Sequence, residues 1–399
     1  MLIKNAKIVT INGIFEGDVK IENGKILQIG NNLSGDEVVD IEGNYLLPGL
    51  IDLNVRLLDD KVNSSNFTRL SQMALAGGVS SVGLIPDLQP PVCDEISLEF
   101  VKSQKCQITI YPFILALREE NTLSEISILL KKGAAGVFTS SDINEYLLAR
   151  VFEYAKMHNI ALHIEPKNRI FRDVGVMEEG EVSFRLGLGG ISRLEEISEI
   201  ARIIEYSEYY DVPVLFKSVS TAKGLELIAK SRLCYAEVSI HHLLFSDEAC
   251  EGYNTFAKLS PPLRQREEQE MVVKALQEGK IDCLTSLHSP KSLVNKDRSF
   301  AEAGFGIDAL SYYLPLLYTK LVKSKLIDFT KLIELCASNP ACFINEKLGK
   351  IEEGMRADMV IFDPNSKIRV NTPSLYKDEE LSGKIKMVII NGKVVSANA

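Results

Sequence analysis

Through the middle of the chain, short continuous apolar runs alternate with longer segments in which apolar residues recur every three or four positions. Short apolar runs are typical of strands buried on both faces, whereas the recurring pattern is typical of amphipathic helices. Eight such runs occur: Leu50–Leu57, Ser80–Pro86, Gln107–Leu117, Ala135–Thr139, Ile160–Ile164, Val212–Val219, Tyr235–Ile240 and Ile281–Leu287. Most precede a helical segment, so the pattern predicts an α/β fold, a (β/α)8 TIM barrel with its functional residues at the C-terminal ends of the strands.

The segment 192–209 shows the helical pattern well. Its apolar positions at helical spacing are Leu194, Ile197, Ile200, Ala201 and Ile204. Ser192 precedes Glu195 by three residues, which predicts a capping box at the start of this helix.

Both ends of the chain have a different pattern, with β-rich runs separated by Asn-Gly pairs at 12–13, 23–24 and 391–392. Asn-Gly between two such runs is a strong hairpin signal. The runs are Leu2–Thr10, Asp18–Glu22, Lys25–Ile29, Asp358–Phe362 and Lys386–Ile390. We expect residues 1–49 and 349–399 to form one composite β-sandwich module, and residues 50–348 to form the barrel. Two unrelated terminal extensions are the alternative.

The amino-acid composition restricts the classes of molecule that this protein is expected to bind. The 399 residues include 45 Lys+Arg and 54 Asp+Glu, a net charge of −9, which argues against nucleic acid or an anionic membrane as the main partner. There is no signal-peptide pattern and no apolar stretch long enough to span a membrane. The seven cysteines form no CxxC pair, which fits a reducing compartment. These features predict a soluble cytoplasmic protein.

The first barrel strand carries a recognisable motif. Residues 48–56 read PGLIDLNVR and resemble the P-G-x-I-D-x-H-x-H strand of the amidohydrolase superfamily. The match holds through Asp52, but Asn54 and Arg56 stand where the family places its paired metal-binding histidines. Asparagine is a poor ligand for a transition metal, and arginine has no lone pair to offer.

Further motifs resemble the dihydroorotase branch of that superfamily over the whole length of the chain. They are ALAGGVS at 74–80, IPDLQPP at 85–91, AEVSIHHL at 236–243, SPPLR at 260–264 and GKIEEGMRAD at 349–358. The resemblance implies the barrel fold and, in a complete member, a metal-dependent hydrolysis of a cyclic amide.

The resemblance also indicates which metal-site residues are altered. Of six ligand positions, five are degenerate: Asn54, Arg56, Ser140, Ser218 and Leu287. Only His163 is retained, and Leu287 replaces the aspartate that both binds metal and moves protons in this family. Asp142 could substitute for the missing acid at Ser140 if the register shifted. A single imidazole cannot hold zinc, because zinc sites use three or four protein ligands. We therefore expect no metal, no other cofactor and no catalytic residue.

The residues expected to line a vestigial pocket are Arg56, Asp87, His163, Glu165, Ser260, Arg264 and His288. Leu58, Asp87 and Ser260 occupy the places where the family holds its anionic substrate, and an acid at Asp87 should repel a dicarboxylate. We consider Arg56 a candidate fixed cation that neutralises acids such as Glu165, the alternative being a solvent-exposed side chain. Arg264 and the 304–306 turn could equally be structural. For the adjacent His241 and His242, structural hydrogen bonding is favoured over metal binding.

The leading functional prediction is a dihydroorotase homologue of pyrimidine biosynthesis without catalytic activity. Some members of this family that have lost their metal ligands are structural partners of aspartate carbamoyltransferase, and this sequence resembles them. A homodimer is also expected from the resemblance. The alternative is an active cyclic amidohydrolase whose zinc is held by His163, Asp142, His288 and Glu165. A third possibility is a ligand sensor that uses the vestigial pocket.

Overall fold

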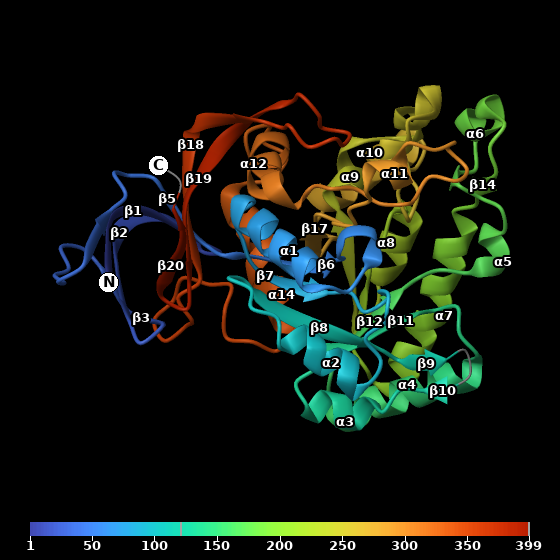
Figure 1. Cartoon of the computed structure of the whole chain (residues 1–399), viewed down its shortest axis with the longest axis horizontal. Coiled ribbons are helices and arrows are strands. Elements are labelled where there is room, and N and C mark those ends of the chain that lie inside the picture. Colours follow the sequence, from blue (N-terminus) through green and yellow to red (C-terminus); the bar gives the residue numbers. More distant parts are fainter. Residues whose placement is uncertain (120–121, 398–399) are drawn as a thin grey trace.

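Eight parallel strands form the centre of the structure, as the apolar runs predict (Figure 1). This computed structural model describes residues 1–119 and 122–397, so residues 398 and 399 of the expected terminal module lie outside it. In sheet order the strands are β6 (Leu50–Val55), β7 (Val79–Leu84), β8 (Thr109–Leu115), β11 (Gly136–Ser140), β12 (Leu162–Glu165), β15 (Val214–Phe216), β16 (Cys234–Ser239) and β17 (Cys283–Thr285). The predicted (β/α)8 barrel is confirmed.

Helices surround the barrel because their apolar faces pack on the outer side of the strands. The helices are α1 (Ser64–Ala76), α2 (Glu95–Lys102), α3 (Ile126–Lys131), α4 (Glu145–His158), α5 (Arg169–Arg172), α6 (Glu181–Leu186), α7 (Leu194–Tyr210), α8 (Ala222–Ile228), α9 (Ile240–Leu244), α10 (Arg266–Gln277), α11 (Leu293–Lys296), α12 (Tyr313–Leu317), α13 (Phe329–Ile333) and α14 (Asn339–Phe343). Short 3-10 or π turns are η1 (Leu58–Asp60), η2 (Asp247–Tyr253), η3 (Thr255–Ala257), η4 (Leu310–Tyr312), η5 (Tyr318–Val322) and η6 (Glu334–Ser338).

The start of α7 differs from the prediction. The helix begins at Leu194 after Arg193, and no side chain caps its N-terminus. Glu195 is turned inward, where it pairs with Arg172 at 3.2 Å and accepts a hydrogen bond from the backbone of Asn168. The predicted capping box of Ser192 and Glu195 is therefore wrong, because a tertiary ion pair takes the carboxylate away from the helix end.

The first and last barrel strands are joined through Asp52. Its buried carboxylate accepts four hydrogen bonds, from Thr285 Oγ1 at 2.6 Å, from the backbone and the hydroxyl of Ser286, and from the backbone of Asn54. Val55 and His288 add a parallel bridge just beyond. Burial raises the pKa of Asp52, and the four hydrogen bonds oppose that rise. The Asp52 carboxylate and this bridge together join β6 to the end of β17 and close the barrel.

The two ends of the chain build one sheet, seen beside the barrel in Figure 1. Its strands are β1 (Leu2–Thr10), β2 (Gly13–Glu22), β3 (Lys25–Gly30), β4 (Val38–Asp40), β5 (Tyr45–Pro48), β18 (Met359–Arg369), β19 (Glu380–Ile390) and β20 (Lys393–Ala397). The N-terminal and C-terminal halves meet where β5 pairs antiparallel with β18. The predicted β-module from both termini is confirmed. Smaller strands are β9 (Leu117–Glu119), β10 (Thr122–Leu123), β13 (Met177–Glu178) and β14 (Gly190–Ile191).

The Asn-Gly pairs form the hairpins that the sequence predicts. At the β2–β3 turn, Asn23 and Gly24 have φ values of 50° and 76°. Two successive positive φ values are the geometry that a tight hairpin requires, and Asn-Gly adopts it at little cost. In the described part of the chain, no helix combines the length and apolar character needed to cross a membrane.

We expect Asp52→Asn to lower the free energy of unfolding by about 2–3 kcal/mol, because its amide group would face a donor at Ser286. Urea unfolding of the purified protein measures this loss. Asp36→Asn is the matched control, since Asp36 is exposed and the change should leave the midpoint unchanged. Equal midpoints for the Asp52→Asn variant and the wild type would contradict the closing role of Asp52.

Candidate functional site

The mouth of the barrel lies at the C-terminal ends of its strands, where the resemblance places the metal ligands. The side chains at those positions are Asn54 and Arg56 at the end of β6, Ser140 in β11, His163 in β12, Ser218 after β15 and Leu287 after β17. Ser218 and Leu287 have φ values of 56° and 47°, an uncommon conformation for residues other than glycine. The backbone is therefore strained at two of the six positions.

A buried hydrogen-bond network joins three of the strands at the centre of this region. Asn54 donates from Nδ2 to Ser218 Oγ at 2.8 Å and to Glu237 Oε1 at 2.7 Å. The ammonium of Lys217 donates to Glu237 Oε2, and also to the carbonyl oxygen of Leu53 at 3.0 Å. The side chains of Lys217 and Glu237 are each 1% exposed. Each charge is thus removed from water and stabilised mainly by the other.

Sequence reasoning missed Lys217 and Glu237, although both carry a signal. Each is a charged residue inside an otherwise apolar strand segment, and the two strands are neighbours in the sheet. Buried charges are rare unless they are paired, so opposite charges on adjacent buried strands indicate a buried ion pair. The fixed cation at the centre of the barrel is therefore Lys217, with Arg56 nearer to solvent.

Arg56 points into the mouth, and its side chain is 14% exposed. Its guanidinium binds both carboxylate oxygens of Asp87, at 2.9 and 3.0 Å, and donates to Asn54 Oδ1 at 3.1 Å. Burial alone would lower the pKa of Arg56, but Asp87 outweighs it and raises the pKa. The solvent-exposed alternative for Arg56 is thereby excluded. The expected repulsion from Asp87 is offset, because Arg56 neutralises that acid directly.

Glu165 ends β12 and faces three cations. The nearest is Lys167, whose Nζ lies 3.9 Å from Glu165 Oε2, too far for a hydrogen bond. Burial alone would raise the pKa of Glu165, but the charges of Lys167, Arg56 and Arg172 together lower it. Glu165 therefore stays ionised at neutral pH.

Two further cations of the mouth also have acidic partners. Arg172 pairs with Glu195 and donates from Nη1 to Ser260 Oγ at 3.0 Å. Lys291 pairs with Asp60. The charges of the mouth are thus balanced pair by pair, and no strong field of one sign would attract a charged substrate.

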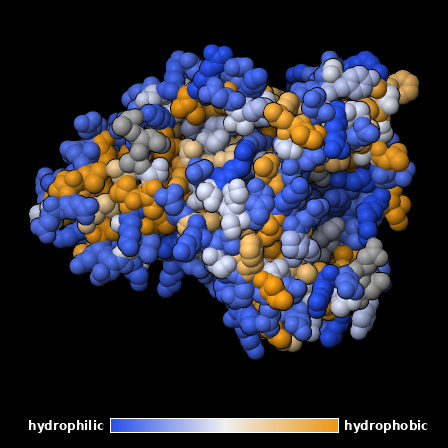
Figure 2. Space-filling view, in the orientation of Figure 1, coloured by the Kyte–Doolittle hydropathy of each residue, from blue (hydrophilic) through white to orange (hydrophobic). Residues whose placement is uncertain are grey.

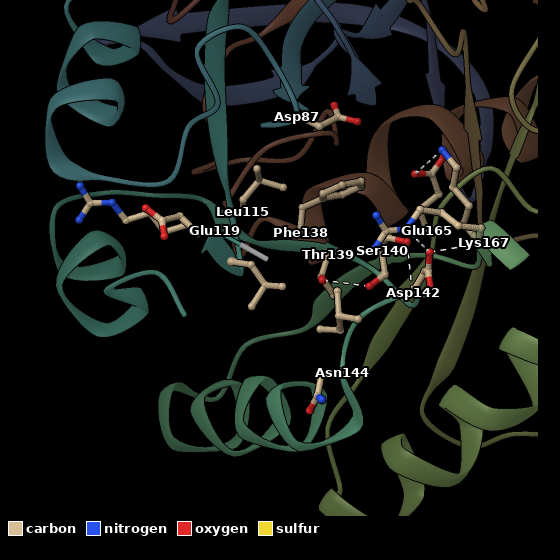
Figure 3. Close-up of a pocket in the computed structure, with 14 residues that line it drawn as sticks. Asp87, Leu115, Glu119, Phe138, Thr139, Ser140, Asp142, Asn144, Glu165 and Lys167 are labelled. Carbon is tan, nitrogen blue, oxygen red and sulfur yellow. Dashed lines mark hydrogen bonds and ion pairs between the residues drawn. The ribbon is translucent and has the colours of Figure 1, made fainter. Parts of the chain in front are cut away.

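Two sizeable cavities open at the mouth. The smaller, of about 240 Å³, is lined by Arg56, Asp60, Asp87, Glu165, Lys167, Arg172, Ser260, Leu287, Ser289, Lys291, Phe305 and Gly306. The larger, of about 750 Å³, extends sideways over β8, β11 and β12, past Phe138 and Ser140 (Figure 3). Figure 3 shows Glu165 and Lys167 beside one another at one side of this larger cavity and Glu119 at the other.

Three residues expected in the vestigial pocket, His163, Arg264 and His288, line neither of these cavities. His163 is fully buried, and its ring packs against Phe113 in a tilted arrangement with centroids 4.2 Å apart. Neither of its ring nitrogens makes a hydrogen bond of ordinary geometry. Burial, then the charge of Lys217, holds the pKa of His163 well below its ordinary value. The retained histidine therefore lies below the mouth as a neutral core residue.

His288 is also buried, with Nδ1 3.8 Å from Asp308 Oδ1. Burial lowers the pKa of His288 to about 3, so the ring is neutral and the contact is not an ion pair. Its carbonyl oxygen accepts from the backbone of Arg56 at 2.7 Å. This residue anchors the loop after β17.

His241 and His242 are structural, as their sequence context favours. They lie on the short helix α9, and both rings are buried. His241 bonds the hydroxyl of Tyr376 at 2.7 Å and the carbonyl of Ser286 at 2.8 Å. His242 bonds Ser239 Oγ at 2.7 Å. These bonds tie α9 to the strand tips.

Arg264 is a buried structural residue at the side of the barrel mouth. It donates to Glu178, to Glu196 at 3.3 Å and to Ser220 Oγ at 2.9 Å. Glu196 also accepts from the backbone of Thr221 at 2.8 Å. Arg264 thus fixes the loop after β15 to α7, and every one of these contacts is internal to the protein.

The alternative ligand set of His163, Asp142, His288 and Glu165 is not assembled. Asp142 accepts hydrogen bonds from the backbone and Nε of Arg169, at 3.0 and 2.7 Å. Among the residues that the structure describes, no group of three or more His, Cys, Asp or Glu side chains could hold a metal ion.

The residues at the mouth do not fit a divalent metal. Arg56 and Leu287 offer no lone pair, and the amide nitrogen of Asn54 is already a donor to two partners. An ion among these residues would also lie beside two fixed cations, Lys217 and Arg56. The donor set and the local charge both oppose metal binding.

Comparison with known proteins gives one consistent result. The model of the amidohydrolase family matches residues 45–395. The dihydroorotase of Carboxydothermus hydrogenoformans is 33% identical over 402 residues, covering 97% of this chain and 92% of that protein. The dihydroorotase of Acetivibrio thermocellus is 31% identical over 422 residues, covering 99% and 98%.

Solved structures agree on the fold. The L-hydantoinase (dihydropyrimidinase) from Arthrobacter aurescens superposes with a TM-score of 0.89 at 20% identity, covering 99% of this chain and 96% of that one. A D-hydantoinase gives a TM-score of 0.87 at 21% identity, covering 99% and 95%. At this identity the likeness establishes the shared architecture alone.

We expect Lys217→Met to destabilise the protein by about 3–5 kcal/mol, because it leaves Glu237 charged, buried and without its cation. The double variant Lys217→Met/Glu237→Leu should recover most of that loss. Urea unfolding of the wild type, the single variants Lys217→Met and Glu237→Leu, and the double variant gives the coupling energy between the two side chains. Lys223→Met is the control, since its pair with Glu226 is solvent-exposed and the change should have no measurable effect. A Lys217→Met variant as stable as the wild type would contradict the role of this pair.

Stability should fall as the pH drops from 7.5 to 5.5. Burial lowers the pKa of His241 to about 3, of His242 to about 4 and of His288 to about 3. Between about pH 6.5 and 4 the unfolded chain therefore binds protons that the folded chain does not. Each histidine contributes a loss of up to about 1.4 kcal/mol per pH unit.

Urea unfolding at three pH values across this range tests that expectation. His288→Leu removes one titrating group and should reduce the slope by about one proton. A free energy of unfolding that stays constant from pH 7.5 to 5.5 would contradict it.

Proposed function

This chain belongs to the amidohydrolase family as a dihydroorotase-like member, and we propose that it is a non-catalytic barrel serving as a structural or regulatory partner of aspartate carbamoyltransferase. The observation that carries the first half of this proposal is the buried network of Lys217, Glu237, Asn54 and Ser218. It occupies the centre of the barrel mouth with a protein cation and leaves no set of metal ligands.

A barrel mouth without a metal would lack a large energetic contribution to hydrolysis. A catalytic metal lowers the pKa of bound water from 15.7 to about 7, equivalent to roughly 12 kcal/mol of help in making hydroxide at neutral pH. Lys217 cannot supply that help, because its ammonium carries one charge and already donates to Glu237 and Leu53. Glu165 is held ionised by three nearby cations and is therefore a weak base. These features support an inactive site.

The surface around the mouth supports a role in protein contact. Several of the most exposed apolar side chains lie on elements that follow the C-terminal ends of β12 and β17: Ile170 is 88% exposed, Phe184 89% and Val294 73%. Figure 2 shows hydrophobic side chains at this end of the molecule. Apolar side chains that protrude around a polar centre are typical of a protein interface.

Elemental analysis together with a dihydroorotate ring-opening assay tests the loss of activity. We expect zinc far below one per chain and no turnover above the uncatalysed rate. The relative named as the dihydroorotase of Carboxydothermus hydrogenoformans, assayed in parallel, is the positive control. Stoichiometric zinc with turnover that a chelator abolishes would replace this proposal with that of an active hydrolase whose metal site differs from the family's.

Co-elution tests the partnership. The purified chain, mixed with aspartate carbamoyltransferase from the same organism, should elute with it in size-exclusion chromatography and change its assembly or activity. Ile170→Asp and Phe184→Asp should abolish the complex. Tyr209→Asp is the control, because Tyr209 is 83% exposed but lies at the far end of α7. Separate elution together with unchanged transferase activity would refute the partnership.

A further inference from the structure

The barrel has a further cavity at the end opposite to its mouth. It has a volume of about 530 Å³ and lies at the N-terminal ends of β11, β12, β15, β16 and β17. Helix α14 and the two residues after it form the remaining wall. The cavity shares no residue with the two cavities of the mouth. Its size lies in the range of small-molecule sites.

One wall of this cavity is aromatic. Tyr235 and Phe343 are both half-buried, and their rings meet edge to face, with centroids 5.2 Å apart at 69°. Ile160 and Ile344 also line the cavity and add apolar surface. A wall of this kind suits a flat ring that stacks on one aromatic face.

The rim carries neutral hydrogen-bonding groups that the protein leaves unused. Asn159 and Asn345 line the cavity, and within the described residues neither side chain makes a hydrogen bond that occupies its amide. Asn339 donates to the carbonyl of Asp282 at 2.9 Å, which leaves its amide oxygen available. Asp282 also lines the cavity, and its Oδ2 accepts from the backbone of Ala236 at 2.8 Å.

Charge decides which ligands this rim can accept. Among the described residues that line the cavity there is no lysine, arginine or histidine, and Asp282 is the one ionisable acid. A phosphate or carboxylate would therefore lack a counter-ion and meet a like charge. Amides both donate and accept, which matches the mixed edges of a heterocycle.

We propose that this cavity binds an uncharged, planar heteroaromatic molecule of nucleobase to nucleoside size. Its ring stacks on the wall of Tyr235 and Phe343, and its edge is read by Asn159, Asn345 and Asp282. The site is independent of the mouth and of any partner that binds there. The protein thus has a small-molecule binding site at the end of the barrel opposite to the mouth.

Cys342 provides a direct reporter of occupancy. It lines the cavity and is exposed, whereas Cys106 is half-buried and the other five cysteines are buried. Alkylation of Cys342 by iodoacetamide, followed by mass spectrometry, should slow several-fold when a ligand fills the cavity. The probes are uracil, cytosine, adenine, uridine and adenosine. The corresponding nucleoside monophosphates serve as charged comparators and should not protect.

Two left-handed asparagines allow a sharp test. Asn159 and Asn345 have φ values of 50° and 53°, so glycine at either position keeps the backbone while removing the amide. The double variant Asn159→Gly/Asn345→Gly should weaken binding at least about 10-fold, the loss expected when hydrogen bonds to a ligand edge are removed. Asn23→Gly, at another left-handed asparagine with a φ of 50° in the terminal module, is the matched control.

Thermal shift with the same compounds gives a second readout that does not depend on the thiol. The expected result is protection of Cys342 and a raised melting temperature with at least one base or nucleoside, both lost in the double variant and kept in Asn23→Gly. Three results would overturn the proposal: no probe protects or stabilises, the monophosphates bind as well as the nucleosides, or the double variant binds like the wild type.

Discussion

The buried ammonium of Lys217 is the interaction on which the centre of the barrel depends. It lies between Glu237 and the backbone of β6, so it links that strand with β15 and β16 through charge-assisted hydrogen bonds. The carboxylate it neutralises also receives the amide of Asn54. Removing a charge of either sign from this cluster would leave the other buried without compensation, which is costly in a medium of low dielectric constant.

This constraint explains the character of the mouth. A barrel that already holds a fixed cation gains nothing from a divalent ion beside it, and the neighbouring acids are matched by protein cations instead: Asp87 by Arg56, Asp60 by Lys291 and Glu165 by Lys167. Such a mouth is stable without a ligand. Its function in our proposal is to present a rigid surface, while the opposite end keeps a cavity whose polar groups are still free to bind.

Part of this fold could be predicted from the pattern of residue types along the chain alone. The apolar runs predicted all eight barrel strands, because strands buried on both faces must be continuous apolar stretches, and the Asn-Gly pairs predicted the hairpins of the terminal sheet. The capping box at Ser192 failed, since a local rule cannot foresee that Glu195 pairs with Arg172 from another loop. Lys217 was missed for a similar reason: its role depends on Glu237, twenty residues away.

The sequence by itself determined the architecture and the lone pairs that Asn54, Arg56 and Leu287 can offer, because the type of a side chain fixes these whatever the fold. Tertiary structure alone decided where the remaining groups point. It placed His163 against Phe113 below the mouth, turned Arg56 onto Asp87, and set Lys217 beside Glu237. Those outcomes depend on distances between residues remote in the chain, which packing of the closed barrel sets and no local pattern encodes.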